Sequence, residues 1–176
     1  MIFLTGLMGS GKTTVGKLLA RRLGWGFADT DVLVERLAKK KVPAIFAEDG
    51  EAHFRRLESR ALAGLAGKRK MVVATGGGIV AKASNRAWLK RHGLVVHLAV
   101  AQRSLLKRLD ARDRSRPLLA GGAKKALANL ARKRAPFYAQ AGIRVKASGS
   151  PKQVCAGILL QIRKKAPTVL ADKTPH

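Results

Sequence analysis

Five short apolar segments of the chain have the length and composition of buried strands. They are residues 2–5, 26–28, 71–74, 94–98 and 142–145. Between and after these segments, apolar residues recur at helical spacing. The expected helices cover residues 12–23, 33–37, 43–67, 84–89, 102–109, 124–141 and 151–162. This alternation predicts a three-layer α/β fold, in which one parallel sheet lies between two layers of helices.

Two segments lack this periodicity. Residues 110–123 are rich in charge, glycine and proline, and they predict a mobile loop. The basic tail, residues 164–176, is expected to be disordered. We therefore expect a single folded domain over residues 1–163.

The segment from 43 to 67 separates its apolar and charged residues. Four apolar residues from Phe54 to Leu65 fall along one helical stripe. Arg55 and Glu58 are one turn apart on a different face of the same helix.

The composition fits one compact domain and excludes several classes of protein. The chain has 176 residues, and 47% of them are hydrophobic, which argues against general disorder. A single cysteine, Cys155, excludes an intrachain disulfide framework and a cysteine-based zinc site. No apolar run approaches the roughly 20 residues that cross a bilayer, and the N-terminal apolar stretch is too short for a signal peptide. A soluble cytoplasmic protein is expected.

The charge of the chain is strongly basic. Lys and Arg number 36 against 10 Asp and Glu, which gives a formal net charge of +26. No acid occurs between Glu58 and Asp110, or between Asp113 and Asp172. Such a charge suits a nucleic-acid-binding protein or a protein on anionic membranes. A general basic bias with solvated Lys and Arg faces is the simpler explanation, so the charge by itself assigns no function.

A phosphate-binding loop follows the first predicted strand. Residues 6–13 read GLMGSGKT and fit the pattern G-x4-G-K-[ST], between a strand and a helix as this motif requires. Glycines let backbone N–H groups converge on phosphate oxygens at the helix N-terminus. Lys12 can reach the β- and γ-phosphates as a catalytic cation, and the Thr13 hydroxyl can join the shell of a Mg²⁺ ion. The residues expected to hold the nucleotide are Gly9, Ser10, Gly11, Lys12, Thr13 and Thr14.

A phosphate-binding loop alone does not distinguish a motor, a switch GTPase and a small-molecule kinase. The length of the chain disfavours large ATPases, and no guanine-recognition signature is present. Asp29 and Asp31 follow the second predicted strand, and residues two apart in an extended strand project to one side. One carboxylate can then hold Mg²⁺ while the other accepts a proton from an attacking hydroxyl. A turn or helix cap is the alternative interpretation of this pair.

Six motifs in this order resemble those of the shikimate kinase family. They are GLMGSGKTTVGKLLA, DTD, FRRLE, TGGG, RPLLAG and KRAPFY, and the resemblance covers roughly residues 1–162. It implies a P-loop kinase fold with a five-stranded parallel sheet, a helical substrate-binding region at about 31–62 and a lid at about 110–123. It also implies transfer of the γ-phosphoryl group of ATP to the 3-hydroxyl of shikimate, with Mg²⁺, on the pathway to chorismate and the aromatic amino acids.

The resemblance assigns roles to individual residues of this chain. Asp31 matches the expected base, which contacts the substrate hydroxyls, and Asp29 matches the acid near Mg²⁺. Arg55 and Arg134 match the two arginines that grip the shikimate carboxylate, which suits planar guanidinium groups. Glu58 matches the acidic companion of Arg55.

Two further roles concern the glycine triplet and the lid. Gly77 matches a backbone N–H donor to substrate, although a tight strand-to-helix turn would also explain a glycine there. Arg116 matches a catalytic lid arginine over the ATP phosphates, where a cation neutralises developing charge. Many family members stack an arginine on adenine where this chain has Leu109; either Arg108 or Arg112 can substitute.

Two other functions remain open at this point. A related kinase could act on gluconate or a nucleoside monophosphate, because two arginines also suit other anions. A nucleic-acid-binding protein with a vestigial nucleotide site would explain the net charge, but the intact motifs argue against it. For the kinase, we expect shikimate and ATP as ligands, no membrane partner, no specific nucleic-acid partner and a monomer.

Overall fold

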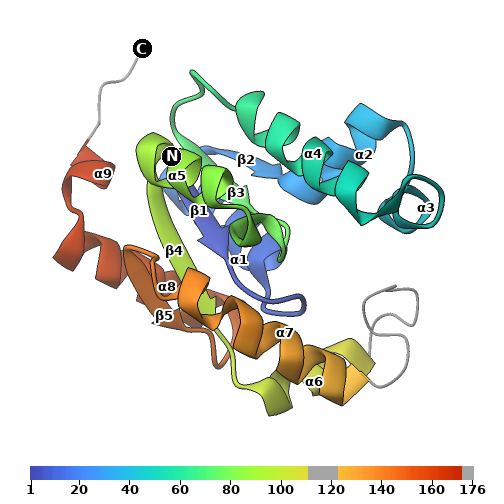
Figure 1. Ribbon diagram of the computed structural model, residues 1–176. Coiled ribbons are helices and arrows are strands. Elements are labelled where there is room, and N and C mark those ends of the chain that lie inside the picture. Colours follow the sequence, from blue (N-terminus) through green and yellow to red (C-terminus); the bar gives the residue numbers. More distant parts are fainter. Residues whose placement is uncertain (111–122, 172–176) are drawn as a thin grey trace.

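The computed structural model describes residues 1–110 and 123–171, and its centre is a five-stranded sheet (Figure 1). The strands are β1 (Ile2–Thr5), β2 (Gly26–Asp29), β3 (Met71–Ala74), β4 (Leu94–Ala99) and β5 (Ile143–Lys146). Their spatial order is β2-β3-β1-β4-β5, and every neighbouring pair is parallel. The predicted five-stranded parallel sheet is confirmed.

Helices connect the strands and cover the sheet. They are α1 (Lys12–Leu23), α2 (Thr30–Ala38), α3 (Val42–Ala44), the π-helical turn η1 (Ile45–Asp49), α4 (Gly50–Ala63), the 3-10 turn η2 (Ile79–Ala81), α5 (Ala83–His92), α6 (Gln102–Asp110), α7 (Ala123–Tyr138), α8 (Pro151–Lys165) and α9 (Thr168–Ala171). Within residues 1–110 and 123–171, no helix combines the length and apolarity that a membrane crossing requires.

The two faces of the sheet bury separate apolar clusters, which produces the three layers. Side chains alternate along β1, so that Ile2 and Leu4 pack with α1 and α8 while Phe3 packs on the opposite face. That opposite face is covered by α5, α6 and α7, whose buried residues include Leu89, Leu105 and Leu127. Helices therefore cover both faces of the sheet, as the uninterrupted apolar strands predicted.

A third, smaller core lies within the segment from α2 to α4, which groups to one side of the sheet (Figure 1). The buried members of this core are Val34, Ile45, Phe54, Leu57 and Ala61. The predicted apolar stripe of α4 supplies three of them. The opposite side of the same helix is thus free to carry charged groups.

Three predictions about helices were wrong. The helix expected over 43–67 is divided into α3, the π-helical turn η1 and α4, which ends at Ala63. The helix predicted from Ser84 begins at Ala83 and has Lys82 as its N-cap, with no side-chain cap. The tail is not irregular throughout residues 164–171, because α8 continues to Lys165 and α9 follows. Apolar residues of α9 pack against the α1–α8 core, which supplies the burial that a short helix needs. Residues 172–176 lie outside the described part.

His97 of β4 is an unusual residue for an interior strand of a parallel sheet. Its side chain points to the α7 face, is 9% exposed and stacks on the ring of Tyr138, with centroids 4.4 Å apart and an interplanar angle of 12°. Within the described residues, its Nδ1 atom has no hydrogen-bond partner. Burial, followed by the positive charges of Arg144 and Lys12, lowers the pKa of His97 from 6.5 to about 4. The folded chain therefore keeps this imidazole neutral.

A neutral buried histidine makes the stability of the fold depend on pH. Between pH 6.5 and about 4 the unfolded chain protonates His97 and the folded chain does not, so the free energy of unfolding falls as the pH falls. We expect His97→Phe, which keeps the ring stack, to remove about 2 kcal/mol of the loss between pH 7 and pH 4.5. Urea unfolding of both proteins at the two pH values measures this. An equal loss in both would contradict it.

Candidate active site

The loop between β1 and α1 has the backbone of a phosphate cradle. Gly9 and Gly11 adopt φ values of 75° and 89°, in the left-handed region that favours glycine. The Lys12 ammonium donates to the carbonyl oxygens of Gly6 and Leu7, both at 2.9 Å, and to the Ser10 hydroxyl at 3.3 Å. The lysine thus lies against the loop whose N–H groups begin α1. A helix N-terminus with an adjacent lysine attracts phosphate oxygens.

The prediction for the aspartate pair was wrong about its local structure. Only Asp29 belongs to β2, and Asp31 lies in the first turn of α2, so the alternation of an extended strand does not relate them. Asp29 caps α2, because its Oδ1 accepts the Asp31 N–H at 3.0 Å. Its Oδ2 accepts the Thr13 hydroxyl at 2.7 Å. The helix-cap interpretation holds for Asp29, which also reaches the phosphate-binding loop.

The glycine turn, residues Gly76–Gly78, follows β3 and leaves no room for side chains at two positions. A Cβ atom on Gly76 would lie 2.6 Å from Asp31 Oδ1 and 2.7 Å from Glu58 Oε1. The Gly76 N–H donates to the Thr30 hydroxyl at 2.7 Å, which holds the start of α2 against the turn. Two carboxylates from different helices therefore meet at the backbone of one glycine.

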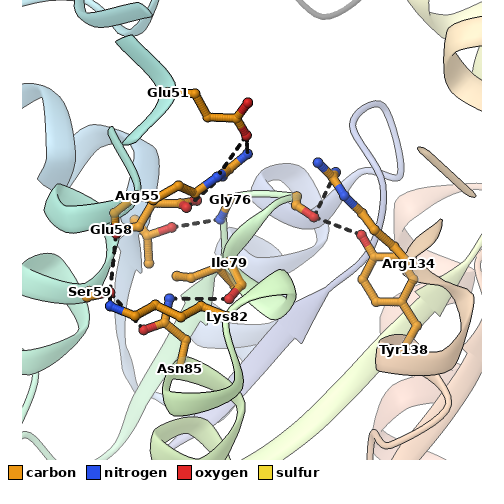
Figure 2. Close-up of polar contacts among 12 residues, drawn as sticks. Glu51, Arg55, Glu58, Ser59, Gly76, Ile79, Lys82, Asn85, Arg134 and Tyr138 are labelled. Carbon is orange, nitrogen blue, oxygen red and sulfur yellow. Dashed lines mark hydrogen bonds and ion pairs between the residues drawn. The ribbon is translucent and has the colours of Figure 1, made fainter. Parts of the chain in front are cut away.

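Glu58 lies next to Arg55 in this part of the site (Figure 2), and it is completely buried. Burial raises its pKa, the nearby charge of Asp31 raises it further, and the positive charges of Arg55 and Arg134 lower it. Its Oε2 accepts from Arg55 Nη1 at 2.6 Å. Its Oε1 has no hydrogen-bond partner within residues 1–110 and 123–171. The carboxyl group thus has a free acceptor on the side of the glycine turn.

Arg55 is held on α4 by two carboxylates, one turn before and one turn after it (Figure 2). Besides Glu58, it donates to Glu51 Oε1 through Nε at 3.2 Å and through Nη2 at 2.7 Å. A Cβ atom on Gly78 would overlap its guanidinium, with 2.6 Å to Cζ. The guanidinium is therefore fixed directly against the glycine turn.

Arg134 approaches the same turn from α7 (Figure 2). It is 6% exposed, and its Nη1 donates to the Gly77 carbonyl at 2.9 Å, as does the Tyr138 hydroxyl at the same distance. In the described part of the chain, it forms no ion pair with a carboxylate. A buried cation without a fixed counter-ion is costly, which favours an anionic ligand here.

The phosphate-binding loop adjoins the glycine turn directly. A Cβ atom on Gly77 would lie 3.4 Å from the Gly6 carbonyl oxygen and 3.5 Å from the Met8 nitrogen. The structure thus brings together the predicted residues Asp31, Arg55 and Arg134 beside the loop that carries Lys12. An acceptor molecule held by the two arginines would face phosphate bound in the loop. Such an arrangement can support phosphoryl transfer to a small anionic molecule.

Sequence reasoning missed several residues that build this site. The network of Ser59, Lys82 and Asn85 joins α4 to α5: the Ser59 hydroxyl lies 3.0 Å from Asn85 Oδ1, and the Lys82 ammonium donates to Ser59 at 3.1 Å (Figure 2). Tyr138 was missed too, although it stands one turn after Arg134 and so shares its helix face. No sequence signal distinguishes the Ser59 network.

The lid predicted at about 110–123 falls largely outside the part of the chain that the structure describes. Most of 110–123, including Arg112 and Arg116, lies outside the described residues, and so do the side chains of Arg108 and Leu109.

Comparisons with known proteins agree on one family. The model of the shikimate kinase family matches residues 8–163. Shikimate kinase of Gloeobacter violaceus is 49% identical over 154 residues, 87% of this chain and 86% of that protein. The structure of shikimate kinase from Acinetobacter baumannii in complex with shikimate has a TM-score of 0.89 and 38% identity, and covers 94% of this chain and 93% of its own.

A gluconokinase from Sinorhizobium meliloti is more distant. Its structure has a TM-score of 0.64 at 18% identity, and covers 98% of this chain and 97% of its own. This similarity shows a common fold and nothing about the substrate. The family match and the identity to named relatives extend over most of this chain, including its site. The chain belongs to the shikimate kinase family.

Proposed function

We propose that this chain transfers the γ-phosphoryl group of ATP to the 3-hydroxyl of shikimate, giving shikimate 3-phosphate and ADP on the route to chorismate and the aromatic amino acids. The observation that carries the proposal is the convergence of Asp31, Arg55 and Arg134 on the glycine turn, beside the phosphate-binding loop. The relatives that match along the chain are named shikimate kinases, and one is solved with shikimate bound.

The two arginines bind the carboxylate of the acceptor. Arg134 supports this role because it is buried and its described hydrogen bond goes to a neutral carbonyl, which leaves other N–H groups for an anion. Arg55 is oriented by Glu51 and Glu58 and presents its guanidinium at the edge of Gly78. The Gly77 N–H adds a neutral donor to the substrate.

Asp31 is the general base. Its carboxylate accepts the proton of the 3-hydroxyl as the hydroxyl oxygen forms a bond to the γ-phosphorus. The bond from that phosphorus to the oxygen bridging the β-phosphate breaks, and ADP leaves with the bonding electrons. The position of Asp31 at Gly76, on the turn that adjoins the loop, supports this role.

The nucleotide binds through its phosphates to Gly9, Ser10, Gly11, Lys12, Thr13 and Thr14. Lys12 lies against this loop, so its ammonium needs only a local movement to exchange carbonyl oxygens for phosphate oxygens. Arg116, from the proposed lid at 110–123, adds a cation over the γ-phosphate during transfer. Lid closure excludes water as a competing acceptor.

Two residues, Thr13 in the first turn of α1 and Asp29 at the end of β2, fit a Mg²⁺ ion. The Thr13 hydroxyl and the Asp29 carboxylate are 2.7 Å apart, and oxygen donors of this kind are the ligands that Mg²⁺ takes together with phosphate oxygens and water. Thr13 and Asp29 would hold the ion, Asp29 directly or through water. When bound, it neutralises charge on the β- and γ-phosphates.

The proposal also covers the organisation of the enzyme. Residues 1–163 form one domain, with the substrate-binding region at about 31–62. The small core of α2, η1 and α4 supports such a region, because it gives these helices packing of their own. We propose that the enzyme acts in the cytoplasm as a monomer.

The activity is tested by ADP release from ATP and Mg²⁺ in a coupled assay. We expect release that depends on shikimate. Gluconate and a nucleoside monophosphate are the competing acceptors to compare with it, because paired arginines bind other carboxylates and phosphates as well; release on either should be slower than on shikimate. Folded protein that releases no ADP with shikimate would refute the proposal. Faster release with another acceptor would reassign the substrate.

Replacing the base tests the assignment of Asp31. We expect Asp31→Asn to lower kcat by about 100- to 10,000-fold, the usual contribution of general-base catalysis. The dissociation constant for ATP should stay within about twofold, because Asp31 belongs to α2 and the substitution leaves the phosphate-binding loop itself unchanged. Single-turnover rates and nucleotide titration measure the two quantities. Unchanged turnover would remove Asp31 from this role.

A methyl group on the glycine turn tests the assignment of Arg55. Gly78 has φ −94° and ψ −11°, which any residue can adopt, so Gly78→Ala changes the space beside Arg55 without straining the backbone. We expect the displaced guanidinium to raise the KM for shikimate about tenfold or more while the KM for ATP is unchanged. Steady-state kinetics with each substrate varied measures both.

Gly157→Ala in α8 is the matched control. A Cβ there would lie 3.6 Å from Val145 Cγ1, an ordinary contact. Alanine in a helix interior should stabilise the fold by up to about 1 kcal/mol and leave both KM values unchanged. If both alanine variants alter the KM for shikimate equally, crowding of Arg55 is not the cause.

A further inference from the structure

We propose that Tyr138 is a positioning residue for the substrate carboxylate, which it serves through the Gly77 carbonyl and Arg134. The inference rests on the proposed function, since it concerns how the site binds shikimate. Tyr138 itself is directed at the protein backbone and not at the acceptor. Its hydroxyl shares one carbonyl oxygen with the arginine that binds the substrate.

Two side chains of α7 donate hydrogen bonds to the same atom, the carbonyl oxygen of Gly77. The Tyr138 hydroxyl and Arg134 Nη1 each donate to Gly77 O at 2.9 Å (Figure 2). The two donors stand one turn apart on α7, and the acceptor lies about 60 residues earlier in the chain. A carbonyl oxygen has two lone pairs, so both bonds can form together. The pair therefore fastens α7 to the glycine turn at a single point.

The two hydrogen bonds to Gly77 O fix the orientation of two groups, the Gly77–Gly78 peptide and the Arg134 guanidinium. Holding the Gly77 oxygen sets the plane of the Gly77–Gly78 peptide, because the peptide unit is rigid and planar. It also holds one N–H of Arg134, so that the rest of its flat guanidinium can turn only about that contact. Without the tyrosine hydroxyl, the carbonyl would follow Arg134 alone and both would move together.

Burial and ring stacking fix the position of the Tyr138 side chain, so that its hydroxyl can hold the Gly77 carbonyl. It is 6% exposed and packs in the apolar cluster between the sheet and α7. His97 stacks on it with nearly parallel rings, 4.4 Å between centroids. Burial raises the pKa of Tyr138 to about 12, although Arg134 acts in the opposite direction, so the hydroxyl keeps the proton that it donates. His97 of β4 thus packs against the face of the Tyr138 ring and restricts its movement.

The first test removes the hydroxyl alone. We expect Tyr138→Phe to raise the KM for shikimate about fivefold, the size expected from one neutral hydrogen bond, with kcat and the KM for ATP within about twofold of wild type. Thr5→Val is the control, because it also removes a buried hydroxyl that donates to a backbone carbonyl. The Thr5 hydroxyl donates to Val96 O at 3.4 Å, and Thr5 lies on β1, far from Arg134 in the sequence. It should lower Tm without changing the KM for shikimate.

A double variant separates positioning from general packing. If Tyr138 acts through Arg134, Tyr138→Phe should change the KM for shikimate less than twofold when Arg134→Lys is already present. A full fivefold effect in that background would overturn the inference, as would an unchanged KM in Tyr138→Phe alone. Absence of shikimate-dependent turnover in wild type would instead overturn the proposed function, and this inference with it.

A measurement on the unaltered protein does not depend on the folding of any variant. Tyr138 is the only tyrosine in the chain, so ¹³C-labelled tyrosine gives one ring signal by NMR. We expect shikimate to shift this signal, through the shared oxygen and Arg134, and ATP alone to shift it far less. Saturation with shikimate without any shift would contradict the proposed role.

Discussion

The absence of Cβ atoms in the glycine turn is the constraint on which the site depends. Carboxylates of Asp31 and Glu58 occupy the space that a side chain at Gly76 would need, and the guanidinium of Arg55 occupies that of Gly78. Larger residues at these positions would push apart groups that come from two different helices. Backbone atoms of β3 and its turn therefore form the surface on which the charged side chains meet.

The buried charged side chains around this turn differ in the partners that they bond. Glu58 is fully buried and bonds Arg55, which also bonds Glu51. Arg134 is buried against a carbonyl, and it forms no carboxylate pair within the part of the chain that the structure covers. Breaking a buried pair is more costly than its net contribution to folding suggests. Under the proposed function, an anionic acceptor would give Arg134 the carboxylate partner that it lacks within the described residues.

The aspartate pair reaches the carboxyl end of the sheet through a local structure that differs from the predicted one. Asp29 and Asp31 were related by strand geometry, yet Asp29 caps α2 and Asp31 begins it. The end of a parallel strand commonly leads into a helix, and a short side chain at that junction both caps the helix and faces the crevice. The same carboxylate therefore serves the fold and reaches Thr13.

Local chemistry along the chain was enough to predict the parallel sheet, the phosphate-binding loop and the residue types of the site, because apolar runs, helical spacing and glycine patterns act over a few residues. The motif resemblance added the roles that we expect for Arg55 and Arg134. Short-range patterns could not reveal that α9 packs on the α1–α8 core, or that Tyr138 and Arg134 share Gly77 O. Those contacts join segments far apart in sequence, so only the packing of helices on the finished sheet decides them.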